Sequence, residues 1–195
     1  NPHLAEDQRA SLELFGRNNA KWFDEYGFSY FTREVFDAFY PGYGASWPSY
    51  YGSVAMTYEQ ASARGLVVNR TDGTTMHFRD SVRHHFVASI STAETAADNR
   101  SKLLTDFYNY RKSAIREGQT ESIKAYILPR TGNVSAVDKL AAILHLQGVE
   151  AQQARAGFRA AGQQFETGSY LVTLAQPSKR LIRTLLDQDV PMDDA

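Results

Sequence analysis

The chain has 195 residues, and its 21 Lys and Arg nearly balance 22 Asp and Glu, which leaves a formal net charge of −1 at pH 7. Such a balance provides no basic footprint for DNA, RNA or an acidic membrane, so we expect no nucleic-acid partner. No apolar run approaches the roughly 20 residues that a membrane span needs, and no span is expected. The sequence contains no Cys, which excludes disulfides, thiol catalysis and thiolate metal sites within it.

The first predicted element is a helix over residues 5 to 26. Its apolar face consists of Leu12, Phe15, Trp22, Phe23 and Tyr26. Gly27 should end the helix, and the aromatic residues 28 to 31 predict a short strand.

A loop with large side chains follows. Two Pro and two Gly fall within eight residues, at Pro41, Gly42, Gly44 and Pro48, and exclude a regular helix there. The aromatic residues crowded between Trp22 and Tyr58 could line a substrate cleft or fill a core.

The next segment ends in a carboxylate. Val54, Met56 and Tyr58 alternate with smaller residues, which predicts a strand over residues 54 to 58. Glu59 would then lie at or just past the carboxyl end of a strand, where open α/β sheets place their ligand crevices. Spacing alone leaves two interpretations open: a functional carboxylate, or a surface Glu that caps a turn or pairs with Arg64.

The residues around Glu59 carry a resemblance. Glu59 is followed by Gln60-Ala61-Ser62 and Arg64-Gly65, and later by Phe78-Arg79-Asp80, Arg83-His84-His85-Phe86 and Ser89-Ile90-Ser91-Thr92. This pattern resembles the last catalytic strand and the following segment of bacterial zinc carboxypeptidases of the carboxypeptidase A family.

The resemblance implies several functional expectations. Glu59 would be the general base and acid in hydrolysis of a peptide or amide bond, with a peptide as substrate and a periplasmic or secreted location. A mobile Tyr closes over the substrate carboxylate in this family, which makes Tyr40 and Tyr43 the substrate-binding candidates. The choice between these two residues stays open.

The family holds Zn²⁺ with an HxxE pair and a later His. The one HxxE here, at His3 and Glu6, lies only about fifty residues before Glu59 and follows no predicted strand, so we interpret it as a chance match. Residues 1 to 4 resemble instead the family's loop after its third ligand. Zinc would then belong to the intact parent protein and to its missing amino-terminal part, and none is expected in this chain, which should be inactive alone.

Two adjacent His residues need separate consideration. His84 and His85 lie in a predicted helix, where neighbouring side chains point about 100° apart. They cannot readily share one metal ion, and we expect one to be packed and the other exposed.

The segment after Glu59 predicts a hairpin and a long helix. Residues 66 to 68 and 74 to 78 flank an Asp72-Gly73 turn. A single helix should then run from about residue 78 to 117, with Val82, Phe86 and Ile90 in the core of the catalytic sheet. We expect a domain boundary between residues 117 and 122.

A second α/β unit is predicted from residue 121 onward. Strands at residues 123 to 128 and 149 to 154, with a helix between them that starts at Ser135, predict a parallel β-α-β unit. Residues 170 to 174 and the helix after Pro177 repeat the strand-helix order. The unit resembles the amidotransferase-like domain appended to some bacterial carboxypeptidase-like proteins, without a Cys nucleophile or a phosphate loop.

Charged residues near the end are interpreted as solvated. The basic residues of the last helix should form an exposed face, and the acidic residues a solvated tail, because they lack the spacing of a calcium loop. These residues are Lys179, Arg180, Arg183, Asp187, Asp189, Asp193 and Asp194.

The predicted fold class is therefore α/β. Residues 1–118 would be the carboxyl-terminal half of a carboxypeptidase-like α/β/α sheet domain, and residues 121–195 the start of an open, incomplete α/β domain. The expected function is that of a part of a zinc metallocarboxypeptidase-like hydrolase. The alternative is a non-enzymatic peptide- or ligand-binding module on the same scaffold.

Overall fold

The computed structural model describes residues 3–31 and 39–190, as a mixture of α-helices and small antiparallel sheets. The chain divides into two compact units. The helical unit comprises Ala5–Ser49 and Ser53–Asp106, and the sheet unit comprises Asn1–Leu4, Tyr50–Gly52 and Phe107–Ala195. The fold is thus of the mixed α and β kind that the sequence predicts. Along the described residues, no helix is both long and apolar enough to cross a membrane.

The helical unit is built on α1 (Glu6–Tyr26) and α2 (Phe78–Asp98), which pack against each other. As predicted, α1 ends at Gly27, which adopts the left-handed conformation with φ +68°. At the other end of α1, the side chain of Gln8 accepts a hydrogen bond from Ala5 N and donates to the carbonyls of Ser49 and Ser53. These bonds attach Ser49 of the short 3-10 helix η1 (Trp47–Tyr51) and Ser53, just after that helix, to the start of α1.

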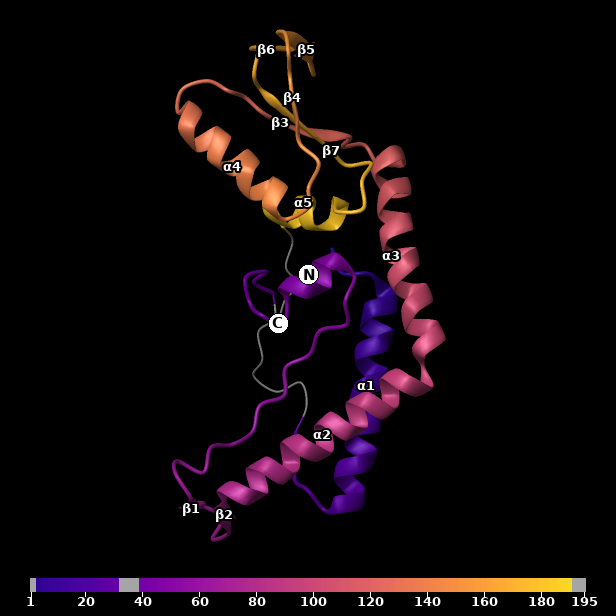
Figure 1. Ribbon diagram of the computed structural model, residues 1–195, viewed down its shortest axis with the longest axis vertical. Helices are drawn as coiled ribbons and strands as arrows, with labels where there is room; N and C mark the ends of the chain where they lie inside the picture. Colours follow the sequence, from indigo (N-terminus) through magenta and orange to yellow (C-terminus); the bar gives the residue numbers. More distant parts are fainter. Residues whose placement is uncertain (1–2, 32–38, 191–195) are drawn as a thin grey trace. The chain divides into compact units, whose positions relative to one another are not determined.

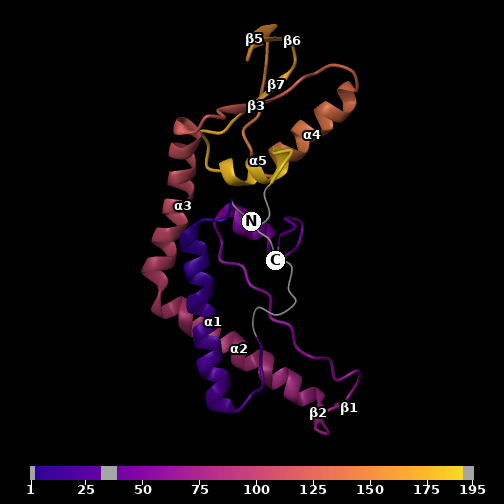
Figure 2. The same cartoon turned by 180° about the vertical axis from the view of Figure 1, so that it is seen from behind.

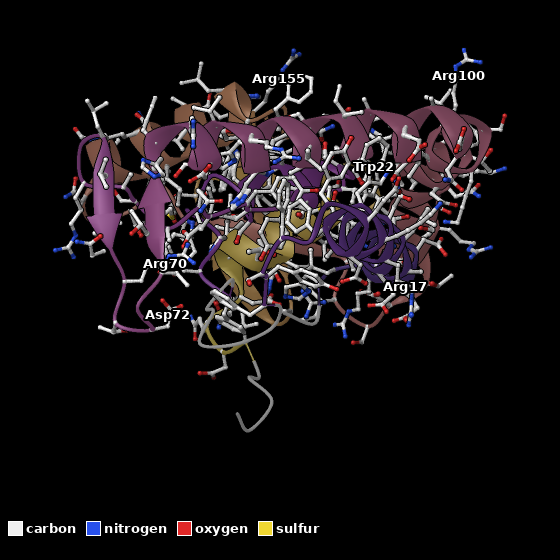
Figure 3. The ribbon with its side chains drawn as sticks, turned by 90° about the horizontal axis from the view of Figure 1, so that it is seen from below. Arg17, Trp22, Arg70, Asp72, Arg100 and Arg155 are labelled. Atoms are coloured by element: carbon white, nitrogen blue, oxygen red, sulfur yellow. The ribbon has the colours of Figure 1, made fainter. Side chains whose placement is uncertain are left out.

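The hairpin that precedes α2 has the predicted turn. Strands β1 (Val67–Asn69) and β2 (Thr75–His77) pair antiparallel. Asp72 Oδ1 accepts from Thr74 N at 2.9 Å and Gly73 takes φ +83°, which only Gly adopts without strain. Arg70 and Asp72 mark this turn in Figure 3. The helix α2 follows at once and is capped by Asp80, whose carboxylate accepts from His77 N.

The strand predicted over residues 54–58 is wrong, and so is the one over residues 28–31. Neither segment is assigned to a strand, and among the described residues no neighbouring strand pairs with residues 54–65. A strand needs a partner for its backbone groups, which an alternating pattern of side chains cannot supply. Residues 53–66 instead run past α1 and α2 down to the β1–β2 hairpin (Figure 1).

The prediction of a single long helix from about residue 78 to 117 is also wrong. It is divided at Asn99 into α2 and α3 (Arg100–Thr120). The predicted core face is reversed too: Val82, Phe86 and Ile90 are 52%, 63% and 41% exposed. The buried face of α2 consists of Val87, Ala88, Ser91 and Thr95. These smaller side chains let α1 approach closely, and Asn18 of α1 donates to Ser91 and Thr95.

The sheet unit has three strands in the order β3-β7-β4, formed by Ala125–Leu128, Tyr170–Thr173 and Gln152–Gln153. Both outer strands pair antiparallel with β7. The strands β3 and β4 therefore point the same way, as the predicted β-α-β unit requires, but they do not pair with each other, because β7 lies between them. Strand order depends on which segment pairs with each strand, and the local β-α-β pattern does not specify that pairing.

Two helices cover one face of this sheet. In β3 and β7, Tyr126 is opposite Val172 and Leu128 is opposite Tyr170, so the two Tyr side chains share a face. Tyr170 donates to Asp138 of α4 (Val134–Leu146), and Tyr126 donates to Asp187 directly after α5 (Lys179–Leu186). Figures 1 and 2 show α4 and α5 on the same side of the strands.

The remaining features of the sheet unit were partly foreseen. Gly148 after α4 takes φ +72°, as expected for a residue that ends a helix. The helix is capped by Asn133, which accepts from Ala136 N, rather than by Ser135. The hairpin of β5 (Phe158–Ala160) and β6 (Gln163–Phe165) was not predicted from the sequence. The domain boundary between residues 117 and 122 stays a prediction.

Candidate functional site

Glu59 lies in the irregular segment that leads from η1 to the hairpin, and its side chain is exposed. A carboxylate at this position can accept protons from solvent or from a bound molecule. Among the described residues, no ion pair holds the Glu59 side chain. The pairing with Arg64 that the spacing left open is therefore not formed. The residues on either side of Glu59 are held.

Tyr58, directly before Glu59, is attached to both helices. Asn19 Nδ2 on α1 donates to the Tyr58 hydroxyl at 2.8 Å, and this hydroxyl lies 3.0 Å from Thr92 Oγ1 on α2. Asn19 is 8% exposed. Breaking this hydrogen bond without a replacement would leave the buried Asn19 amide without that acceptor, which costs free energy. The bond therefore holds Tyr58 against α1.

Gln60, directly after Glu59, is attached to α2. His84 Nδ1 lies 2.8 Å from Gln60 Oε1, and the imidazole packs 4.2 Å from the ring of Phe28, measured between centroids. Burial lowers the pKa of His84 below its ordinary value, against the smaller opposing influence of Asp80. Because the Gln60 amide oxygen can only accept, this hydrogen bond requires the tautomer of His84 that carries its proton on Nδ1.

The two candidate Tyr residues lie together in the loop before η1. The rings of Tyr40 and Tyr43 meet edge to face with centroids 5.3 Å apart, and they are 59% and 46% exposed. The Tyr40 ring folds over Gly42, where an added Cβ would lie 2.5 Å from the ring. Among the described residues, no hydrogen bond or ring contact joins either Tyr to Glu59. Both residues stay candidates.

The described residues do not supply a metal site. No group of three His, Asp or Glu side chains among residues 3–31 and 39–190 could hold a metal ion. His85 is exposed and His84 is engaged by Gln60, so the adjacent pair does not converge. His3 lies 3.5 Å from Asp187 within the sheet unit. Zinc therefore does not fit the described part of this chain by itself.

Asp187 is the centre of a small polar cluster in the sheet unit. It accepts from Arg183 Nε and from the Tyr126 hydroxyl, and it lies near His3. Burial lowers the pKa of His3, while burial and the bond to Asp187 raise the pKa of Tyr126. All groups in this cluster are engaged with one another, which is the arrangement of a structural network.

The interpretation of the basic residues of α5 as a solvated face is wrong for Lys179 and Arg180, which are only 5% and 8% exposed. Lys179 pairs with Glu117 at 2.9 Å and with Glu121. Arg180 donates to Tyr110 O, Ser113 Oγ and Glu117, and its guanidinium stacks over the Tyr110 ring at 4.4 Å. Acidic residues at the end of α3 thus neutralise the start of α5. The four Asp near the end divide likewise: Asp187 is engaged, Asp189 is exposed as predicted, and Asp193 and Asp194 lie outside the described residues.

Sequence reasoning missed the residues that hold the chain around Glu59. Asn19 and His84 are separated from it by about 40 and 25 positions, and although the His84–His85 pair predicts one packed imidazole, the local pattern of neither residue indicates a contact with the segment around Glu59. The sequence offered one indirect signal, because a Tyr and a Gln flank the carboxylate and both need partners when packed against helices.

Comparison with known proteins adds no relative to this description. No family model matches the sequence, and searches of curated proteins and of solved structures give no match either.

Proposed function

We propose that this chain is part of a metallocarboxypeptidase-like hydrolase in which Glu59 is the general base and acid. The observation that carries the proposal is the sequence around Glu59, from Gly52 to Gly65, with its resemblance to a catalytic strand. Glu59 would accept a proton from the attacking water and return it to the leaving amine. Its exposed carboxylate, flanked by two attached residues, is compatible with that role.

The surface of α2 also supports the proposal. Phe78, Val82, Phe86 and Ile90 form a row of exposed apolar side chains at a spacing of four residues. A row of this kind on a soluble protein usually marks a surface that another part of a protein covers. We assign that cover to polypeptide of the parent protein outside these 195 residues, which would also supply the metal ligands.

A longer protein with upstream sequence tests the proposal. Glu59→Gln should keep the fold and the bound zinc but lower turnover of a peptide with a free terminal carboxylate by about 10² to 10⁴. Gln retains size and hydrogen bonding and removes the basic oxygen, so the change reports on proton transfer. Glu25→Gln, at an exposed position of α1, is the matched control and should leave turnover unchanged.

Zinc content separates the enzyme from the binding module. We expect stoichiometric zinc in the longer protein after mild dialysis and none at a catalytic site in the 195-residue chain. Zinc held by the short chain and lost in His3→Ala or Glu6→Ala would reinstate the HxxE pair. A longer protein without zinc or hydrolytic activity that still binds peptide would favour the non-enzymatic alternative.

A further inference from the structure

Side-chain hydrogen bonds attach the residues on both sides of Glu59 to the helices α1 and α2. Tyr58 and Gln60 turn toward the helices, where Asn19 and Thr92 hold the first and His84 holds the second. Glu59 lies between them and is exposed. A third contact, 3.4 Å from Ser81 Oγ to the carbonyl of Ala61, continues the attachment along α2.

This pattern restricts the direction in which Glu59 can point. Because the residues before and after it are hydrogen-bonded to helices, we expect the backbone at Glu59 to rotate little, although it lacks strand partners among the described residues. A displacement of about 1 Å at a catalytic group can lower a rate on the order of 10²-fold. Groups that orient a catalytic side chain can therefore affect turnover without contact with the substrate.

We propose that Asn19 and His84 are positioning residues that direct the Glu59 carboxylate through Tyr58 and Gln60. The inference rests on the proposed function of Glu59. Neither residue contacts a reacting atom in this arrangement, and each acts through one hydrogen bond to a neighbour of Glu59. His84 also needs Phe28 behind it, since that packing fixes the plane of its ring.

The first test needs no activity and uses the 195-residue chain. Backbone ¹⁵N order parameters of residues 58–61 should be near the rigid value of about 0.85 and fall toward about 0.6 in His84→Ala and in Tyr58→Phe. His85→Ala, at the exposed neighbouring position, is the control and should leave them unchanged. Unchanged order parameters in both variants, with folding confirmed by circular dichroism, would overturn the inference.

The second test measures turnover in the longer protein. His84→Ala should lower kcat about 10-fold or more with KM nearly unchanged, because positioning acts on the transition state. His84→Asn should restore most of the loss, since its amide can donate to Gln60 from a similar place. A fall in kcat without rescue would overturn the assigned hydrogen bond.

Turnover of the Glu59, His84 and Tyr58 variants distinguishes the positioning role from the catalytic role of Glu59. If Glu59→Gln lowers turnover but His84→Ala and Tyr58→Phe do not, the positioning role is overturned and the catalytic role stands. If Glu59→Gln leaves turnover unchanged, both are overturned, whatever the order parameters show.

Discussion

His84 and His85 are neighbours in the sequence and lie in different surroundings. His84 is packed between Gln60 and Phe28, and His85 is exposed. The helical period predicts this division, because adjacent residues point about 100° apart. The period does not say which of the two is packed, and that depends on where the segment around Gln60 lies.

The two half-buried His residues, His3 and His84, predict a dependence of stability on pH. Burial lowers the pKa of His3 and of His84 below the ordinary 6.5, so between about pH 7.5 and 5.5 the unfolded chain binds more protons than the folded one. Their contribution is present above pH 6.5 and is lost as the pH falls, against the opposing influence of Asp187 and Asp80. The free energy of unfolding by urea should therefore be lower at pH 5.5 than at pH 7.5.

His84→Asn should reduce this difference, since Asn does not titrate. The carboxyl groups whose pKa is lowered, such as those of Asp80 and Asp138, respond only at more acidic pH and do not interfere. An equal difference in wild type, in His84→Asn and in His3→Asn would show that other groups control stability in this window.

At the scale of elements, α2 buries the side that its large apolar residues do not occupy. Its buried positions carry small or polar side chains that pack on α1, and Trp22 of α1 donates to Glu94 at 2.6 Å. Trp22 of α1 is labelled in Figure 3. The hydrophobic period therefore locates an apolar face correctly but does not identify its partner.

Adjacent substitutions on α2 test this orientation. Phe86→Ala should lower the free energy of unfolding by less than about 1 kcal/mol, because a side chain 63% exposed loses little contact. Val87→Ala, 4% exposed in the wild type, should cost about 2 kcal/mol. Urea unfolding of the two variants measures the difference. A larger loss for Phe86→Ala than for Val87→Ala would place the opposite face in the core.

Gly118 near the end of α3 predicts a second contrast. An added Cβ there would lie 2.0 Å from the carbonyl oxygen of Leu174, a backbone atom that cannot move aside easily. Gly118→Ala should destabilise the chain by about 2 kcal/mol or more. Gly16→Ala in α1, where nothing lies within 4 Å, should stabilise it by about 0.5 to 1 kcal/mol, and thermal unfolding compares the two. Equal effects would mean that α3 does not pack on the strand end in solution.

At the scale of the whole molecule, each unit has its own means of stabilisation. In the helical unit, α1 and α2 hold the long irregular segment before the hairpin by side-chain hydrogen bonds. In the sheet unit, three short strands carry two helices on one face, and buried charges at the start of α5 are neutralised by the end of α3. Removal of one partner from such a buried pair leaves an uncompensated charge, which costs much more than loss of a surface pair.

Local patterns in the sequence correctly identify α1 with its terminating Gly27, the hairpin around Asp72 and Gly73, and the strands β3 and β7. Each of these depends on residues within a few positions of one another. Partners distant in the chain determine the rest: the absence of a strand before Glu59, the buried face of α2, the insertion of β7 between β3 and β4, and the burial of Lys179 and Arg180. For the candidate site, the sequence indicated Glu59, and the tertiary contacts of Tyr58 and Gln60 show how its backbone is held, because a hydrogen bond across 24 or 39 positions leaves no mark in a local pattern.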